Sequence, residues 1–446
     1  MFHGLKGIFH KDKGGQNLLK HGAMAVASQS RRSSAVEDAP RRVRLADISG
    51  ERSQFGLENR LSEASGSGSR RTLPVGGLAS RSSVMETRPL PKRNWSTASD
   101  MPAERSAQAL ALAMMGDGKD VRAEGSVKIA STITTSAEIM CCRFSNNGVH
   151  LAVGTVSGGT SIYSTDDVAS HVVLLQDHDT LERSMPVTCA RFVPVPEPKP
   201  STVLLNAYGD GLVKFWRYMS GECLQTLDVD EQVLALSFDC LGKYFQLAGE
   251  DGAIRVFDAA TSRLAGRLHA SADHALNDGH RSRVFALAAH PHTPHELLSA
   301  GWDNTVQFWD MRHPHAVRRI YGPHICGEGL SIDPISNRVV TASWRRRQAL
   351  QVWDYGSGEL ITDIQPDSHE SMQTGAQFMG QDYLAASGGF VNLVRMIDCR
   401  AFVTVGSIRN VPQSVRCQDV SVCADKQFPR IAACFGSEAL LIDTWY

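Results

Sequence analysis

Short apolar runs recur along most of this chain at a nearly constant spacing, which limits its fold more than any other feature. From residue 126 onward, runs of about five to eight residues rich in Val, Ile, Leu and Phe alternate with Gly, Asp, Asn and Pro turns. Many short strands at regular intervals predict an all-β sandwich, barrel or propeller. The runs that open each unit begin near Ile139, Val187, Val233, Val284, Gly327, Thr374 and Ser414. Their average step of about 46 residues is close to the length of a four-stranded propeller blade and predicts seven blades.

The fourth unit has the most informative sequence, GHRSRVFALAAHPHTPHELLSAGWDNTVQFWD. It opens with Gly279-His280 and ends with Trp309-Asp310, and in these residues the chain resembles the WD-repeat β-propeller family. The resemblance implies a seven-bladed propeller over residues 126–446. It also implies one large apolar side chain per unit that packs between neighbouring blades. That position is occupied by Tyr163, Trp216, Phe257, Trp309, Trp353, Ile397 and Ile442.

The same resemblance assigns a structural role to four polar or aromatic residues of the fourth unit. His280, Ser299, Asp303 and Trp309 match the positions of the family's internal hydrogen-bond network. In that network the indole N–H, the hydroxyl, the imidazole and the carboxylate satisfy one another inside the blade. The histidine, aspartate and serine are therefore interpreted as scaffold residues and not as a catalytic triad.

The two ends of the repeat region predict how the ring closes. The seventh unit has strands near 414–423, 430–435 and 439–445, so its fourth strand is missing. A spare strand, VKIASTITT at 127–135, precedes the first unit. We expect this strand to complete the last blade, because such closure protects sheet edges that would otherwise be exposed.

Residues 1–125 have a different composition. They contain four of the chain's 31 aromatic residues and 20 Lys and Arg against 13 Asp and Glu. Such a Ser- and Arg-rich stretch buries too little apolar surface to offset chain entropy, so we expect a basic, mostly disordered tail. A short helix is predicted at 100–115, with Asp100 as its N-cap and Gly116 as its stop. This helix either docks on a folded surface or forms only transiently.

The tail also contains candidate targeting and regulatory signals. Its first fifteen residues place apolar side chains at helical spacing among basic ones, as both mitochondrial targeting segments and solvated tails do. Ser33, Ser34 and Thr72 stand beside paired arginines, so they are candidate phosphorylation sites or ordinary parts of a linker. The ten cysteines form no C-x-x-C pair, which fits reduced thiols in a reducing compartment. We expect a cytoplasmic protein, with nuclear and mitochondrial locations as alternatives.

Motifs for catalysis and for ligand binding are missing from the sequence. There is no phosphate-binding loop of the G-x-x-x-x-G-K-[ST] type, no H-E-x-x-H and no G-x-S-x-G. The histidine-rich HPHTPH at 290–295 is interrupted by proline and offers a poor tetrahedral ligand set. No run of about eighteen apolar residues occurs, and the charge asymmetry is too weak to predict nucleic-acid binding. We expect a non-enzymatic protein without cofactor or metal, whose partners are other proteins.

One turn stands out as a candidate contact for a partner. In the fifth unit, SWRRRQ replaces the expected Asp turn, in a loop one residue longer than its equivalent in the fourth unit. Arginines beside a tryptophan, on an otherwise acidic body, are suited to bind a carboxylate or phosphate. The alternative is a solvated basic turn with an incidental indole. The predicted partner-binding surface consists of Tyr208, Trp302, His324, Trp344, Arg345, Arg346 and Arg347.

A second candidate surface follows from the end of the fourth unit. LLSAGWDNTVQFWDMR at 297–312 resembles the box ending in W-D-x-R that marks substrate receptors of cullin-type ubiquitin ligases. The resemblance implies that Arg312 faces an adaptor subunit on the opposite rim. The sequence therefore favours an interaction scaffold or adaptor that binds partners through its rim loops, with a ubiquitin-ligase substrate receptor as the alternative.

Overall fold

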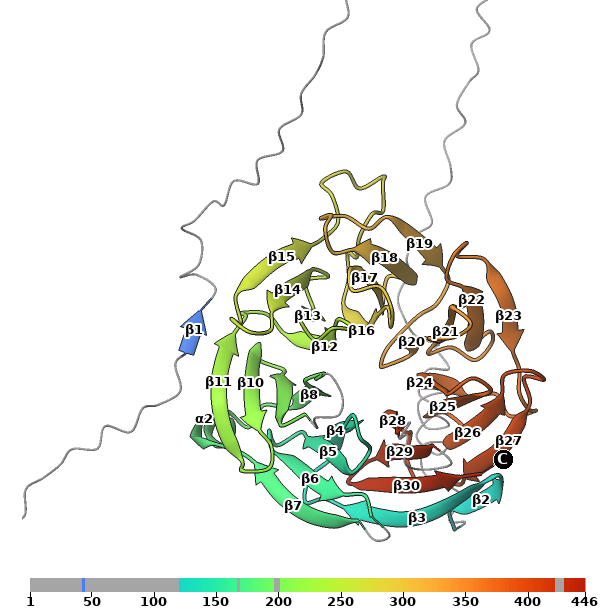
Figure 1. Cartoon of the computed structure of the whole chain (residues 1–446). Helices are drawn as coiled ribbons and strands as arrows, with labels where there is room; N and C mark the ends of the chain where they lie inside the picture. Colours follow the sequence, from blue (N-terminus) through green and yellow to red (C-terminus); the bar gives the residue numbers. More distant parts are fainter. Residues whose placement is uncertain (1–41, 45–119, 167–168, 196–200, 422–428, 446) are drawn as a thin grey trace, which may run out of the picture. The chain divides into compact units, whose positions relative to one another are not determined.

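Seven β-sheets are arranged in a ring around a central axis (Figure 1). They belong to the second of the two units into which the chain divides, residues 40–446, and the first unit, 1–39, lies outside the described residues. The predicted seven-bladed propeller is confirmed. The computed structural model describes residues 42–44, 120–166, 169–195, 201–421 and 429–445.

Each blade has four antiparallel strands, which in blades 1–6 follow one another in the chain from the axis outward, whereas the outermost of the four in blade 7 comes from earlier in the chain. Blades 1 and 2 consist of β4 (Ile139–Phe144), β5 (His150–Thr155), β6 (Thr160–Ser164) and β7 (Ser170–Leu175), and of β8 (Val187–Phe192), β9 (Val203–Tyr208), β10 (Leu212–Arg217) and β11 (Glu222–Asp228). Blades 3 and 4 consist of β12 (Val233–Phe238), β13 (Tyr244–Gly249), β14 (Ile254–Asp258) and β15 (Leu264–Leu268), and of β16 (Val284–Ala289), β17 (Glu296–Gly301), β18 (Thr305–Asp310) and β19 (Arg318–Tyr321).

The remaining three blades follow the same plan. Blades 5 and 6 consist of β20 (Leu330–Ile332), β21 (Arg338–Ala342), β22 (Leu350–Asp354) and β23 (Leu360–Ile364), and of β24 (Met372–Met379), β25 (Tyr383–Gly389), β26 (Leu393–Asp398) and β27 (Thr404–Arg409). Blade 7 consists of β28 (Cys417–Ser421), β29 (Arg430–Phe435), β30 (Glu438–Thr444) and β3 (Val127–Thr134). A short helix, α2 (His178–Arg183), connects blades 1 and 2. No helix among the described residues is both long and apolar enough to span a bilayer.

The core lies between neighbouring blades, because the second and third strands of each blade are apolar on both faces. In blade 3, Phe245 of β13 stacks on Phe257 of β14 with ring centroids 5.1 Å apart, and Phe215 of blade 2 packs edge-on against Phe245. All seven side chains at the predicted blade-packing position are buried. The outer strands are more exposed, as β23 shows, in which three of the five residues are exposed. Burial between blades therefore supplies the main driving force for the ring.

Strand β3 closes the ring, as the sequence predicts. It pairs antiparallel with β30, from Val127 opposite Thr444 to Thr134 opposite Glu438. The last blade is therefore built from two segments that lie at opposite ends of the propeller sequence, and β3 and β30 are adjacent in Figure 1. This pairing leaves blade 7 with the same number of strands as a blade formed from one continuous segment.

Two short strands outside the predicted pattern extend blades at their outer edges. β2 (Arg122–Gly125) pairs antiparallel with β27 of blade 6, just before residue 126, where the sequence places the start of the propeller. β1 (Arg42–Arg44) pairs in parallel with β11 of blade 2. The predicted helix at 100–115 and the candidate phosphorylation sites lie outside the described residues.

Candidate functional site

The two ends of the disc present different loops. Because neighbouring strands of a blade are antiparallel, the turn between its second and third strands and the turn between its third and fourth strands lie at opposite ends. We call the end with the turns between second and third strands the upper rim and the opposite end the lower rim. The connections between blades also lie on the upper rim.

The four predicted network residues of blade 4 are connected by short hydrogen bonds. Asp303 accepts from His280 Nδ1 at 2.7 Å, which leaves Nε2 of a neutral ring as an acceptor. The Ser299 hydroxyl lies 2.6 Å from this Nε2 and accepts from Trp309 Nε1 at 2.7 Å. Burial acts to raise the pKa of Asp303, but the interactions with His280 and the hydrogen bonds from Thr305 together outweigh it, and the pKa lies below its usual value. Since Ser299 is completely buried, this network is structural.

Trp302 and His324 form an aromatic pair on the upper rim. Their rings stack with centroids 6.5 Å apart and an interplanar angle of 16°. Trp302 is 42% exposed, and the Arg283 guanidinium carbon lies 5.3 Å from the centre of its ring. The stacked pair therefore offers a flat, partly exposed aromatic surface with a cation beside it.

The arginine turn of blade 5 lies next to this aromatic pair. The Trp344 backbone N–H donates to His324 O at 2.8 Å, which joins the two loops. The Trp344 side chain lies over Gly389 of blade 6, where an added Cβ would be 3.1 Å from the indole. The turn is two residues longer than its equivalent in blade 4, and not one residue longer as predicted. The hydrogen bond from Trp353 to Thr341 spans 12 residues, whereas the equivalent bond in blade 4, from Trp309 to Ser299, spans 10.

The three arginines of this turn have different roles. Arg345 supports the loop, because it donates to Gly322 O at 3.0 Å and to Gln351 Oε1 at 2.8 Å. Burial lowers the pKa of Arg345. Arg346 is exposed, with its guanidinium 4.1 Å from the centre of the Phe390 ring. Arg347 is exposed and forms no hydrogen bond or ion pair with any described residue. Two of the three predicted arginines are therefore available to a partner.

A cavity of about 330 Å³ lies beside Arg346 and Arg347, between blades 5 and 6. Its deepest cation, Arg395, is already neutralised by two contacts with Asp367, at 2.8 Å and 2.9 Å. Gln373 also lines the cavity; it is 2% exposed, and its Oε1 has no hydrogen-bond partner among the described residues. The cavity thus combines two exposed cations, which have no ion pair among the described residues, with an unsatisfied acceptor in its wall.

Tyr208 does not belong to this surface. It is the last residue of β9 and packs between blades 1 and 2, where it is 2% exposed. The prediction that it lies on the partner-binding surface is wrong, because both faces of β9 pack against neighbouring blades and the last five residues of the strand are all buried.

Arg312 lies on the lower rim, in the turn that follows β18. Its side chain is 66% exposed, and its guanidinium holds the Asp310 carboxylate, with Nη2 2.6 Å and Nε 2.9 Å from the two oxygens. Hydrogen bonds from Arg312 lower the pKa of Asp310 to about 2. Arg312 therefore already has a partner within its own turn.

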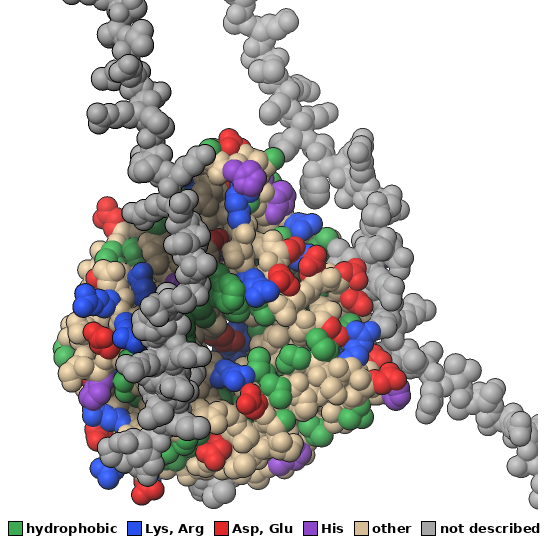
Figure 2. Space-filling view, turned by 180° about the vertical axis from the view of Figure 1, so that it is seen from behind, with side chains coloured by type: hydrophobic (Ala, Val, Ile, Leu, Met, Phe, Trp, Pro, Cys, Tyr) green, Lys and Arg blue, Asp and Glu red, His purple; other side chains and the backbone are tan. Residues whose placement is uncertain are grey.

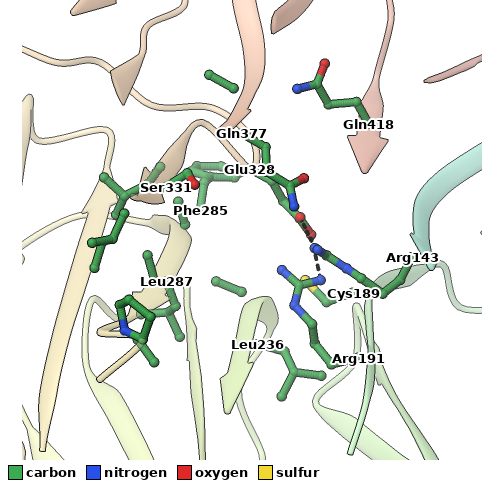
Figure 3. Close-up of a pocket in the computed structure, with 18 residues that line it drawn as sticks. Arg143, Cys189, Arg191, Leu236, Phe285, Leu287, Glu328, Ser331, Gln377 and Gln418 are labelled. Atoms are coloured by element: carbon green, nitrogen blue, oxygen red, sulfur yellow. Dashed lines mark hydrogen bonds and ion pairs between the residues drawn. The ribbon is translucent and has the colours of Figure 1, made fainter. Parts of the chain in front are cut away.

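The axis of the propeller contains a cavity of about 280 Å³ that the sequence did not reveal (Figure 3). Figure 2 shows a hollow at the centre of the disc, with acidic, basic and hydrophobic side chains in it. Glu328, just before β20, binds both Arg143 of blade 1 and Arg191 of blade 2, the latter at 2.9 Å. Arg143 also binds Asp419 of blade 7 at 2.7 Å. These two cations and two anions connect four blades across the axis.

Electrostatics agree with this pairing. Burial acts to raise the pKa of Glu328, but the two guanidiniums outweigh it and hold the pKa below its usual value. Burial raises the pKa of Asp419 despite its contact with Arg143. Arg143 and Arg191 occupy the same place in their units, in IMCCRF and VTCARF. Aligning the units with one another could therefore have revealed this pair of arginines.

Comparison with known proteins agrees with this architecture. The family model described as WD domain, G-beta repeat matches residues 274–310. The target of rapamycin complex subunit wat1 of Schizosaccharomyces pombe is 27% identical over 178 residues, which cover 40% of this chain and 53% of that protein. The guanine nucleotide-binding protein subunit beta of Arabidopsis thaliana is 26% identical over 251 residues, or 53% of this chain and 62% of that protein.

A third relative, autophagy-related protein 16 of Arabidopsis thaliana, is 22% identical over 239 residues, which cover 51% of this chain and 44% of that protein. The chain thus spans about half the length of these relatives. The repeat match falls on blade 4, the blade with the complete His280–Trp309 network. The seven-bladed ring, the WD-repeat match on blade 4 and the similarity to these relatives support a WD-repeat β-propeller.

Proposed function

We propose that this propeller is a non-enzymatic interaction scaffold that binds a segment of a partner protein at its upper rim, beside blades 5 and 6. The observation that supports this most directly is the pair of exposed cations, Arg346 and Arg347, at the mouth of a cavity. Exposed guanidiniums form strong, bidentate contacts with carboxylates and phosphates. Three relatives are named as subunits or components of cellular assemblies or processes, which fits a protein with protein partners.

The lining of the cavity defines the partner segment further. Arg346 and Arg347 bind a carboxylate or a phosphate of the partner. The side-chain Oε1 of Gln373 and the exposed Glu370 carboxylate accept hydrogen bonds from a neighbouring basic or amide group of the same partner. The partner segment therefore pairs an anionic residue with a hydrogen-bond donor. The Trp302–His324 stack extends the same surface with aromatic area of the kind found at interface hot spots.

Affinity purification with matched charge reversals tests this proposal. The double variant Arg346→Glu/Arg347→Glu is compared with wild type and with Arg263→Glu, an exposed arginine on the lower rim of blade 3. We expect the double variant to lose at least about tenfold in the recovery of a partner, since removing charge-assisted contacts costs on the order of 1.5–3 kcal/mol. Recovery with Arg263→Glu should stay at the wild-type level. Equal recovery of every partner by all three proteins would refute the proposal.

The alternative function, a substrate receptor of a cullin-type ubiquitin ligase, depends on Arg312. This residue is exposed on the lower rim, so it is accessible to an adaptor once its contact with Asp310 opens. The same purification separates the two functions. Recovery of an adaptor and a cullin that is lost on Arg312→Ala would establish the receptor, and their absence would exclude it. Cytoplasmic location stays a prediction.

A further inference from the structure

Three cysteines meet where the ring closes. Cys142 lies on β4 of blade 1, and Cys417 and Cys434 lie on β28 and β29 of blade 7. Their three Sγ atoms all lie within 4.8 Å of one another. Cys417 and Cys434 are direct cross-strand partners, and Cys142 faces them from the next blade. No local motif in the sequence reveals this cluster, because Cys142 lies 275 positions or more from the other two cysteines.

The surroundings of the three thiols are dry and apolar. Cys142 is 2% exposed and Cys434 is completely buried, while Cys417 is partly buried. Residues of the closing strand and of both blades pack around them, among them Ile133, Leu151 and Leu441. Among the described residues, no histidine, aspartate or glutamate joins the cluster as a further ligand.

Three sulfurs without nitrogen or oxygen ligands form a soft site. Three thiolates around one ion at about 2.3 Å would lie about 4 Å from one another, so small side-chain rotations bring these sulfurs to ligand distance. Structural zinc prefers four ligands, and the apolar packing leaves little access for a water molecule as the fourth. Thiolate ligands select Cu(I), for which three sulfurs are sufficient.

We propose that Cys142, Cys417 and Cys434 form a three-sulfur site for one Cu(I) ion at the seam between the first and last blades. Each sulfur that binds as a thiolate releases its proton to solvent, and the oxidation state of copper does not change. The bound ion connects β4 to β28 and β29, so it adds a second link to the closure that β3 provides. Metal binding thereby stabilises the closed ring.

A competition titration tests the site. The full chain, kept reduced with a phosphine and free of oxygen, is mixed with Cu(I) held by bathocuproine disulfonate, and the copper transferred to the protein is measured. Wild type should take one Cu(I), with thiolate-to-copper absorption in the ultraviolet. The variant Cys417→Ser should lose more than about 100-fold in affinity, since loss of outer-shell partners alone costs roughly 10–100-fold.

Cys141→Ser is the matched control. Cys141 is the neighbour of Cys142 on β4 and equally buried, but it packs with Val187 and Trp216 toward blade 2. The affinity of the Cys141→Ser protein for Cu(I) should stay within about threefold of wild type, a change of less than about 1 kcal/mol in binding free energy. Copper should raise the unfolding temperature of wild type and Cys141→Ser and leave that of Cys417→Ser unchanged.

Three outcomes would overturn the proposal. The first is that wild type takes up no copper from the competitor. The second is that Cys141→Ser and Cys417→Ser lose affinity for Cu(I) to the same extent. Displacement of the copper by an equimolar amount of zinc sulfate would also contradict a three-coordinate copper site. The unfolding temperature of copper-free Cys417→Ser shows whether that variant is folded, and its partly buried position makes it the safest of the three substitutions.

Discussion

Blades 4 and 5 are neighbours with the same strand order, yet they stabilise their upper turns in different ways. In blade 4, Asp303 binds His280 at 2.7 Å and Thr305 Oγ1 at 2.8 Å, so the turn is fixed from within the blade. In blade 5, Trp353 donates to Thr341 at 2.9 Å, but the turn has no equivalent aspartate. Arg345 takes over that supporting role by binding Gly322 of the preceding connection.

The inner strand of blade 5 is also shorter than that of blade 4. β16 of blade 4 has six residues, whereas β20 of blade 5 has three. Glu328 precedes β20 and binds Arg143 and Arg191 across the axis. Blade 5 therefore depends on contacts with other blades, and its turn displays two exposed arginines that form no hydrogen bond or ion pair with any described residue. A turn that is not fixed by its own blade leaves side chains exposed, and such loops on a rigid scaffold are where proteins commonly place their binding residues.

The largest expected effect concerns the core of blade 4. Replacing Trp309 with alanine removes a buried indole and its bond to Ser299, and should lower the free energy of unfolding by about 3–5 kcal/mol. Trp344→Ala, in the upper turn of blade 5, should lose less than half as much because Trp344 is only partly buried. Urea unfolding of both variants measures the difference. Equal losses would show that the two turns are not specialised as described.

The next effect concerns the inner strand of blade 5. Glu328→Ala leaves Arg143 and Arg191 without their shared carboxylate, and should cost about 3 kcal/mol. This value is at the lower end of the range for breaking a buried ion pair, because the Glu328 side chain is 28% exposed. The same urea unfolding measures the loss. A loss below about 1 kcal/mol, as for an exposed pair, would show that the axial contacts do not hold the blades together.

The hydrogen-bond network of blade 4 also predicts a dependence on pH. The folded pKa of Asp303 lies below its unfolded value, so the stability from this carboxylate is present above the unfolded pKa, about 3.9, and is lost as the pH falls through the folded pKa. Asp303→Asn should lower the free energy of unfolding by about 1–2 kcal/mol at pH 7 and by less at pH 3. Unfolding at several pH values measures the gap between wild type and variant. A gap that does not narrow in acid would contradict the ionic role.

The smallest effects separate the arginines of the blade 5 turn. Arg345→Ala breaks three hydrogen bonds of the loop and should cost about 1 kcal/mol of stability. Arg347→Ala should change stability by less than about 0.5 kcal/mol, because Arg347 binds no described residue. Thermal unfolding distinguishes the two. A larger loss for Arg347→Ala than for Arg345→Ala would reverse their assigned roles.

The features predicted correctly were those with a local signal. The spare segment at 127–135 and the incomplete seventh unit could be matched by counting strands, and β3 pairs with β30 accordingly. The His280–Trp309 network could be assigned because blade 4 contains its complete sequence pattern. Both predictions needed only residues within one unit, or the number of units.

The features that were missed depend on which distant residues meet. Glu328 lies 137 positions from Arg191, and only the closed ring brings them to the axis. Tyr208 and Arg345 were placed on the partner surface, but packing between blades 1 and 2 buries Tyr208, and hydrogen bonds within the loop engage Arg345. The orientation of a side chain at the end of a strand or within a long turn is set by its neighbours in space, which a single sequence does not show.

The position of the bound partner is the most direct test of the difference between the rims. A photo-crosslinking amino acid is placed at position 347 on the upper rim or at position 263 on the lower rim, and the chain is irradiated with the partner recovered by affinity purification. We expect crosslinked partner from position 347 and none from position 263, with the yield at 347 lost when Arg346 is changed to glutamate. Crosslinks from position 263 alone, or equally from both positions, would contradict binding at the upper rim of blades 5 and 6.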